Sequence, residues 1–135
     1  MTEQNTAGTG VEDRVARPGG VSYLRIPARD IAESAEFYRA VFGVEEYWRE
    51  EGQIQAKTPG SHDVLVFNEG TTDAGQSGGI AHFGFRLVDP SDINAAVEAV
   101  ERAGGTVLSR GDFIPGEPYA FIADPDGYEV EIWYE

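Results

Sequence analysis

The sequence predicts an α+β fold made of two βαβββ repeats that form a curved, half-open mixed sheet. The order strand, helix and three strands occurs twice along the 135 residues. The spacing repeats as well, because Tyr23 lies seven residues before Asp30 and His82 lies seven residues before Asp89. One half cannot bury its own sheet face, so two curved four-stranded sheets are expected to pair side by side as a half-open cup.

The first repeat, residues 20–68, opens with a strand and a helix. Val21–Pro27 is the strand, and the residues after it place apolar side chains at helical spacing. Asp30 followed by Glu33 is typical of a capping box, and Gly43 supplies a left-handed end to the helix. Three further strands, separated by turn residues, are expected at Val44–Arg49, Gln53–Lys57 and Asp63–Asn68.

The second repeat, residues 80–135, shows the same order of elements after a glycine-rich linker at residues 69–79. A strand is expected at Ile80–Val88 and a helix at Ser91–Ala103, where apolar residues again recur at helical spacing. The last three strands are expected at Thr106–Arg110, Tyr119–Ala123 and Tyr128–Tyr134. Residues 20–135 are therefore interpreted as one domain, preceded by a flexible polar tail at residues 1–19.

The charge and composition restrict the possible partners. There are 24 acidic and 10 basic residues, so the formal net charge is −14. Such a surface repels phosphate backbones and anionic lipids, so we expect neither nucleic acid nor membrane as a partner, whereas a cationic ligand would be favoured. The absence of cysteine and of a secretory signal predicts a cytoplasmic protein without disulfides.

Three segments carry a resemblance to a known family: VSYLRIPARDIAESAEFYRAVFG, GIAHFGFRL and FIADPDGYEVEIW. In order, they resemble the first strand and helix, the fifth strand and the closing hairpin of the vicinal oxygen chelate superfamily. This superfamily comprises glyoxalases, bleomycin-resistance proteins and extradiol dioxygenases. The resemblance covers about residues 20 to 135 and supports the same two-repeat fold.

The resemblance implies a metal site, which this sequence retains only in part. Its metal-dependent members hold a divalent ion with residues of the first, fifth and eighth strands. The corresponding residues are Tyr23, His82 and Glu131, and the position of an occasional fourth ligand falls near the apolar Val64–Val66. A divalent ion (Ni, Zn, Mn or Fe) is thus expected on His82 and Glu131. Neutral tyrosine is a poor third ligand.

Alternation along the strands predicts which side chains share the site. Arg25 lies on the face of Tyr23, Arg86 on that of His82, and Trp133 on that of Glu131. Two arginines beside one carboxylate suggest a second hypothesis, in which a guanidinium pairs with Glu131 where a metal would otherwise lie. The remaining candidate ligand-binding residues are the aromatic side chains of Phe121, Tyr119 and Trp48.

Three functions follow from these residues. The first is a metal-dependent lyase, isomerase or dioxygenase that acts on a small oxygenated metabolite, with Glu131 and Tyr23 as catalytic residues. The second is a metal-free protein that binds a drug or metabolite, as bleomycin-resistance proteins do. The third is a metal-free enzyme that uses Tyr23, His82 or Glu131 for acid–base chemistry. The resemblance also predicts a homodimer.

Overall fold

The computed structural model describes residues 16, 21–72, 74 and 80–135. The expected tail at residues 1–19 lies outside this description apart from Ala16, as do residues 73 and 75–79 of the expected linker. Within the described ranges, no helix combines the length and the apolar character that crossing a bilayer requires.

The first repeat forms a four-stranded mixed sheet, which we call sheet 1, and one helix. Sheet 1 has the strand order β1-β4-β3-β2, in which β1 and β4 are parallel and the other pairs are antiparallel. Asp30 accepts a hydrogen bond from the backbone N–H of Glu33, and Gly43 ends the helix with φ of 72°. The elements are β1 (Tyr23–Ala28), α1 (Ile31–Phe42), β2 (Glu45–Glu50), β3 (Gln53–Lys57) and β4 (Val64–Glu69).

The second repeat forms sheet 2, with the order β5-β8-β7-β6 and again one parallel pair, β5 with β8. Its elements are β5 (Phe83–Arg86), a short 3₁₀ turn η2 (Pro90–Asp92), α2 (Ile93–Arg102), β6 (Thr106–Asp112), β7 (Pro118–Ala123) and β8 (Glu129–Trp133). The predicted α+β fold with two βαβββ repeats is thereby confirmed.

Most predicted bounds differ from the observed ones by one or two residues, and two differences in the second repeat have structural consequences. The strand expected at Ile80–Val88 is shorter, so His82 lies one residue before β5 and not within it. The helix expected from Ser91 begins as a 3₁₀ turn, because Asp89 caps the N–H of Ser91 and Pro90 has no N–H of its own.

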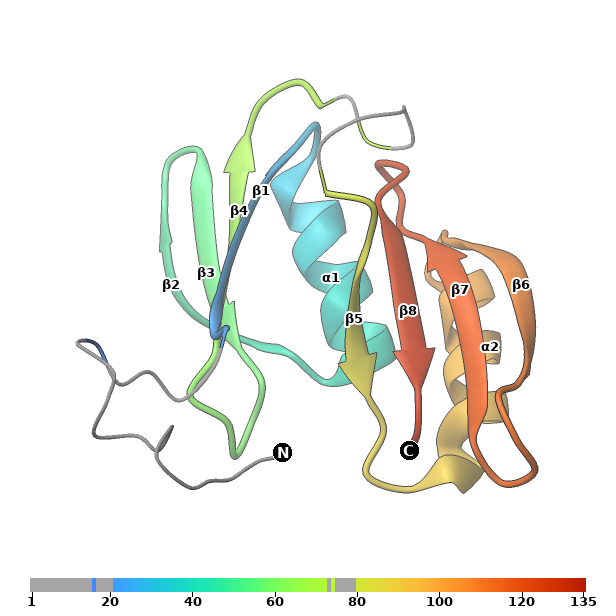
Figure 1. The fold of residues 1–135 in the computed structure, drawn as a ribbon. Coiled ribbons are helices and arrows are strands. Elements are labelled where there is room, and N and C mark those ends of the chain that lie inside the picture. The colour runs from blue at the N-terminus through green and yellow to red at the C-terminus, as the bar shows by residue number, and fades with distance from the viewer. Residues whose placement is uncertain (1–15, 17–20, 73, 75–79) are drawn as a thin grey trace.

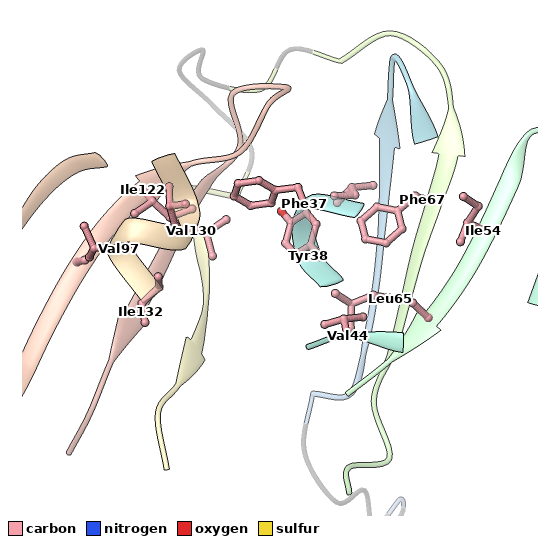
Figure 2. Packing of buried hydrophobic residues seen from close by; sticks show 14 of the residues in the cluster. Phe37, Tyr38, Val44, Ile54, Leu65, Phe67, Val97, Ile122, Val130 and Ile132 are labelled. Atoms are coloured by element: carbon pink, nitrogen blue, oxygen red, sulfur yellow. The ribbon is translucent and has the colours of Figure 1, made fainter. Parts of the chain in front are cut away.

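One hydrophobic core joins the two repeats, and α1 lies at its centre between the two sheets (Figures 1 and 2). Tyr38 of α1 packs against Phe67 of β4 on one side and Phe85 of β5 on the other, with ring centroids 5.2 Å and 6.2 Å apart. Phe42 stacks on Phe85 at 3.9 Å. Each sheet therefore buries the face that it turns towards α1.

The opposite face of each sheet looks away from this shared core. The backbone ladders of the two sheets are separate, since β1 pairs with β4 and β5 pairs with β8. The side-by-side pairing that would join both sheets into one cup does not occur among the strands of the described chain. Residues expected to share one site are consequently divided between two outward faces.

Buried polar contacts fix the turn between β7 and β8 to the first repeat. Tyr38 Oη donates to Asp124 Oδ2 at 2.9 Å, and Ser34 Oγ donates to Asp126 Oδ2 at 3.1 Å. Arg29 Nε donates to Asp126 Oδ1 at 2.8 Å. Burial raises the pKa of Asp124 and raises that of Tyr38 well above its usual value, so Tyr38 keeps the proton that it donates.

Candidate functional site

The outward face of sheet 2 gathers most of the predicted site residues. Along β7 and β8, Ala120, Ile122, Val130 and Ile132 are buried in the core, so the residues between them face outward. We define the site face as this outward set together with His82, which precedes β5. It consists of His82, Gly84, Arg86, Tyr119, Phe121, Glu129, Glu131 and Trp133.

His82 and Glu131 form a direct hydrogen bond at the centre of the site face. The distance from His82 Nε2 to Glu131 Oε1 is 3.2 Å, and the Glu131 side chain is 18% exposed. An ionised carboxylate can only accept, so Nε2 must carry the proton in this pair. Glu131 lies between its register partners Gly84 of β5 and Phe121 of β7, which hold it in the middle of the sheet.

A second carboxylate, Glu129, lies on the other side of the imidazole. Its Oε2 is 3.9 Å from His82 Nδ1, a separation at which the attraction depends on protonation of the ring. Glu129 was not among the predicted site residues. The signal was present in the alternation of β8, where residues 129, 131 and 133 share one face.

Aromatic rings continue from His82 across β7. The ring of Phe121 meets that of His82 edge to face at 5.1 Å, and Tyr119 lies 5.7 Å from Phe121. Phe113, from the loop between β6 and β7, stacks on Tyr119 at 4.6 Å. The predicted residues Phe121 and Tyr119 are thus next to the His82–Glu131 pair, and Phe113 extends the row.

Two glycines leave room for aromatic rings to lie across the sheet. A Cβ on Gly84 would lie 2.7 Å from Cζ3 of Trp133, and a Cβ on Gly111 would lie 2.9 Å from Oη of Tyr119. Real side chains cannot approach so closely, so both rings pass over positions where the neighbouring strand has no side chain. Sequence reasoning missed this role, although a glycine inside a strand often marks such a close approach.

The predicted site residues of sheet 1 lie apart from this pair. Tyr23 is 56% exposed at the start of β1, and Trp48 is exposed on β2 opposite Gln55. Within the described ranges, no hydrogen bond or ion pair joins Tyr23 to His82 or Glu131. The roles predicted for these residues remain predictions.

The arginine–carboxylate pair expected in place of a metal is not formed, so that hypothesis is wrong for Glu131 within the chain. Arg25 belongs to sheet 1, where its Nε donates to Asn68 Oδ1 at 3.1 Å. Arg86 is opposite Trp133 and reaches Glu135 at 3.4 Å. Glu131 is instead the partner of His82, and both arginines bind other acceptors.

The donor set does not fit a catalytic divalent ion, which needs about three protein ligands. His82 and Glu131 are adjacent, but among the residues that the structure describes no three His, Cys, Asp or Glu side chains converge as a possible metal site. The position of an occasional fourth ligand is occupied by Val66, which is fully buried and apolar. The described residues of one chain therefore supply two ligands, His82 and Glu131, and lack a third.

A cavity of about 670 Å³ lies between the edge of β1 and the residues that lead into β5. This volume is within the range of about 300–1,000 Å³ that is common for small-molecule sites. Tyr128 belongs to the lining, and its hydroxyl accepts from Thr72 and donates to the carbonyl of Pro27, two other lining residues. Most of the cavity lining is apolar and includes Leu24, Ile26 and Phe83. Ionisable groups come from Arg25, His82 and Glu129.

Comparison with known proteins agrees with this architecture. The chain is 27% identical to a probable lactoylglutathione lyase of Vibrio parahaemolyticus, over 84% of this chain and 89% of that protein. It is 28% identical to a glyoxylase-like domain-containing protein of Didymella fabae, over 81% and 88% of the two chains.

Solved structures show the same fold at lower identity. The fosfomycin resistance protein FosX of Mesorhizobium loti superposes with a TM-score of 0.72 at 17% identity, over 87% of this chain and 93% of that chain. A lactoylglutathione lyase of Agrobacterium tumefaciens superposes with a TM-score of 0.67 at 22% identity, over 88% and 96%.

A family model described as the Glyoxalase/Bleomycin resistance protein/Dioxygenase superfamily matches residues 20–132. This range contains both βαβββ repeats except the last residue of β8, Trp133, and every other predicted site residue. The chain therefore belongs to the Glyoxalase/Bleomycin resistance protein/Dioxygenase superfamily.

Proposed function

We propose that this protein binds a small organic molecule directly on the site face, with no metal ion between protein and ligand. The observation that carries the proposal is the His82–Glu131 hydrogen bond of 3.2 Å beside a row of aromatic rings. The imidazole holds one carboxylate oxygen, which leaves Glu131 Oε2 to accept from a ligand. Among the described residues, Oε2 has no protein donor.

The aromatic residues supply most of the contact area in this proposal. Buried aromatic side chains contribute large apolar areas, and ring pairs add about 0.5–1.5 kcal/mol beyond area burial. Phe121, Tyr119 and Trp133 are all partly exposed, so their rings are accessible to a ligand. Arg86 lies at the end of this face, next to Glu135, and can orient a polar substituent.

A second candidate is a metal-dependent, glyoxalase-type lyase in which Glu131 and Tyr23 are catalytic. It is favoured by the names of two relatives, both probable lactoylglutathione lyases, which are 27% identical to this chain. His82 and Glu131 also occupy two positions at which metal-dependent relatives carry ligands. This candidate requires a further donor beside His82 and Glu131, for example one contributed by a second copy.

Titration of metal-free protein separates the two candidates. The protein is treated with chelator, and Ni²⁺, Zn²⁺, Mn²⁺ and anaerobic Fe²⁺ are then titrated by calorimetry. The same titrations use His82→Ala and Glu131→Ala, with His62→Ala as the control because His62 is the other histidine and is exposed. We expect no stoichiometric binding. Micromolar one-to-one binding that only the first two substitutions abolish would overturn the proposal in favour of the lyase.

We also propose that the protein is a homodimer. Large apolar side chains are exposed on both outward faces, among them Trp48 on β2, Leu108 on β6 and Phe113 in the following loop. Contact between copies would cover such side chains and the unpaired strand edges. Light scattering after size exclusion should give twice the mass of one chain, and a single-chain mass at micromolar concentration would refute the dimer.

A further inference from the structure

The site face has a floor of two aromatic rings that extends across the whole width of sheet 2. Tyr119 and Trp133 are register partners on β7 and β8. The ring of Tyr119 reaches over Gly111 on β6, and that of Trp133 reaches over Gly84 on β5. Two side chains of adjacent strands thus cover parts of all four strands, which is possible only because both outer positions are glycines.

Phe121 forms a wall beside this floor. It belongs to the next outward position on β7 and stands at 65° to Tyr119, with the ring centroids 5.7 Å apart. Phe113 stacks on Tyr119 with an interplanar angle of 24°. Phe113 thus covers the outer face of Tyr119, but it comes from a loop and is itself 51% exposed, so a flat ligand ring could replace it there.

Carboxylates dominate the charge beside the floor. Glu131 is one outward position away from Trp133, which corresponds to about 7 Å along a strand. Glu129 follows one position further on, and both carboxylates face the His82 imidazole. The cationic groups near them are His82, when protonated, Arg86, which is paired with Glu135, and Arg25, which lines the cavity shared with His82 and Glu129 and donates to Asn68. The chain as a whole carries a formal charge of −14.

We infer that the site face recognises a planar aromatic cation, and this inference rests on the direct ligand binding proposed above. The flat ring would lie on Trp133 beside Phe121 and take the place of Phe113 on Tyr119, where aromatic faces also attract positive charge. The positive charge would lie beside Glu131, whose Oε1 is held by His82 and whose Cβ lies next to the Trp133 ring over Gly84. A neutral ring satisfies only the floor, and an anion is repelled by both glutamates.

Three acridines of similar shape test the class of ligand. They are 9-aminoacridine, a planar cation at neutral pH; acridine, which is planar and neutral; and acridine-9-carboxylate, which is planar and anionic. Each is titrated into the full-length protein by calorimetry in the presence of chelator. We expect 9-aminoacridine to bind at least about tenfold more tightly than acridine, and the carboxylate to bind most weakly.

Matched variants locate the site. Glu131→Gln should weaken 9-aminoacridine about tenfold and leave acridine unchanged, because the change removes only the charge. Glu101→Gln, at an exposed position on α2, changes the net charge equally and should change neither affinity. Gly111→Ala should weaken all the ring ligands by displacing Tyr119. Tyr119→Leu removes the same part of the floor if Gly111→Ala fails to fold.

Other outcomes would overturn the inference in distinguishable ways. Equal affinity for the three acridines, or tightest binding of the carboxylate, would refute the cationic class and leave direct small-molecule binding intact. Tight binding of the cation that no variant on the site face alters would place the ligand elsewhere. Failure of all three probes to bind would refute this inference, and uptake of a divalent ion through His82 and Glu131 would in addition refute the proposed function.

Discussion

Substitution of Tyr38 by phenylalanine should destabilise the protein without changing its packing. Tyr38 is fully buried, and its hydroxyl donates to Asp124 Oδ2 at 2.9 Å. Asp124 is only 4% exposed, and its other oxygen already accepts from the backbone N–H groups of Asp126 and Tyr128. Removal of the hydroxyl therefore leaves Oδ2 buried without its donor.

The expected magnitude follows from the charge of the acceptor. A hydrogen bond to a charged group contributes about 1.5–3 kcal/mol, and loss of one partner exposes the desolvation cost of the other. We expect Tyr38→Phe to lower the free energy of unfolding by about 2–3 kcal/mol. That is a large part of a typical total of about 5–15 kcal/mol. The melting temperature should fall by roughly 5–10 °C.

Urea denaturation followed by circular dichroism measures this loss. Tyr23→Phe is the matched control, because Tyr23 is exposed and forms no hydrogen bond through its hydroxyl within the described residues. Its unfolding free energy should change by no more than about 0.5 kcal/mol. If Tyr38→Phe costs no more than Tyr23→Phe, the Asp124 network does not contribute to the stability of the fold.

Three further predictions concern stability and metal. Because burial raises the folded-state pKa of Asp124, its contribution to stability is greatest below its unfolded pKa of about 3.9 and is lost as the pH rises through the folded value. The unfolding free energy of the wild type minus that of Asp124→Asn should thus decrease from about pH 4 towards neutrality; an increase would contradict the assignment. Gly84→Ala should cost about 1–3 kcal/mol in urea denaturation, because its Cβ would lie 2.6 Å from the carbonyl of Glu131, whereas Gly70→Ala has room and should cost much less. Treatment with EDTA should leave the melting temperature unchanged, and a fall of several degrees on chelation would indicate a bound structural ion.

The elements of the fold could be predicted because local signals determine them. Asp30 and Gly43 marked both ends of α1, and the expected strand Gln53–Lys57 is β3 without any change of bounds. The repeat of strand, helix and three strands predicted the two mixed sheets. Such signals lie within a few residues of each other, so the sequence displays them directly.

The arrangement of the two sheets could not be predicted in the same way. Both outward faces alternate as expected, but alternation does not tell whether two such faces meet in one chain. Stacking of Phe42 on Phe85 and the Tyr38–Asp124 hydrogen bond place α1 between the sheets. These contacts join residues more than forty positions apart, and no local pattern identifies them as partners.

The sequence predicted which residues make up most of the candidate site, but it did not predict the hydrogen-bond partners of the arginines. Glu131 and His82 were expected to lie close together, and they do so at 3.2 Å. The partners of Arg25 and Arg86 were not foreseen, because an arginine side chain reaches several acceptors and the nearest one depends on the tertiary structure. The role of Gly111 and Gly84 was not predicted either, because it depends on which ring of a neighbouring strand lies over each glycine.

Chemical-shift mapping with isotope-labelled protein tests metal-independent binding on the site face. 9-Aminoacridine is titrated in the presence of EDTA, and amide and aromatic resonances are followed by NMR. We expect saturable shifts concentrated at His82, Gly84, Phe121 and Glu131, and their loss in Glu131→Gln. Shifts confined to other surfaces, or shifts on the site face that appear only after a divalent ion is added, would contradict metal-independent binding there.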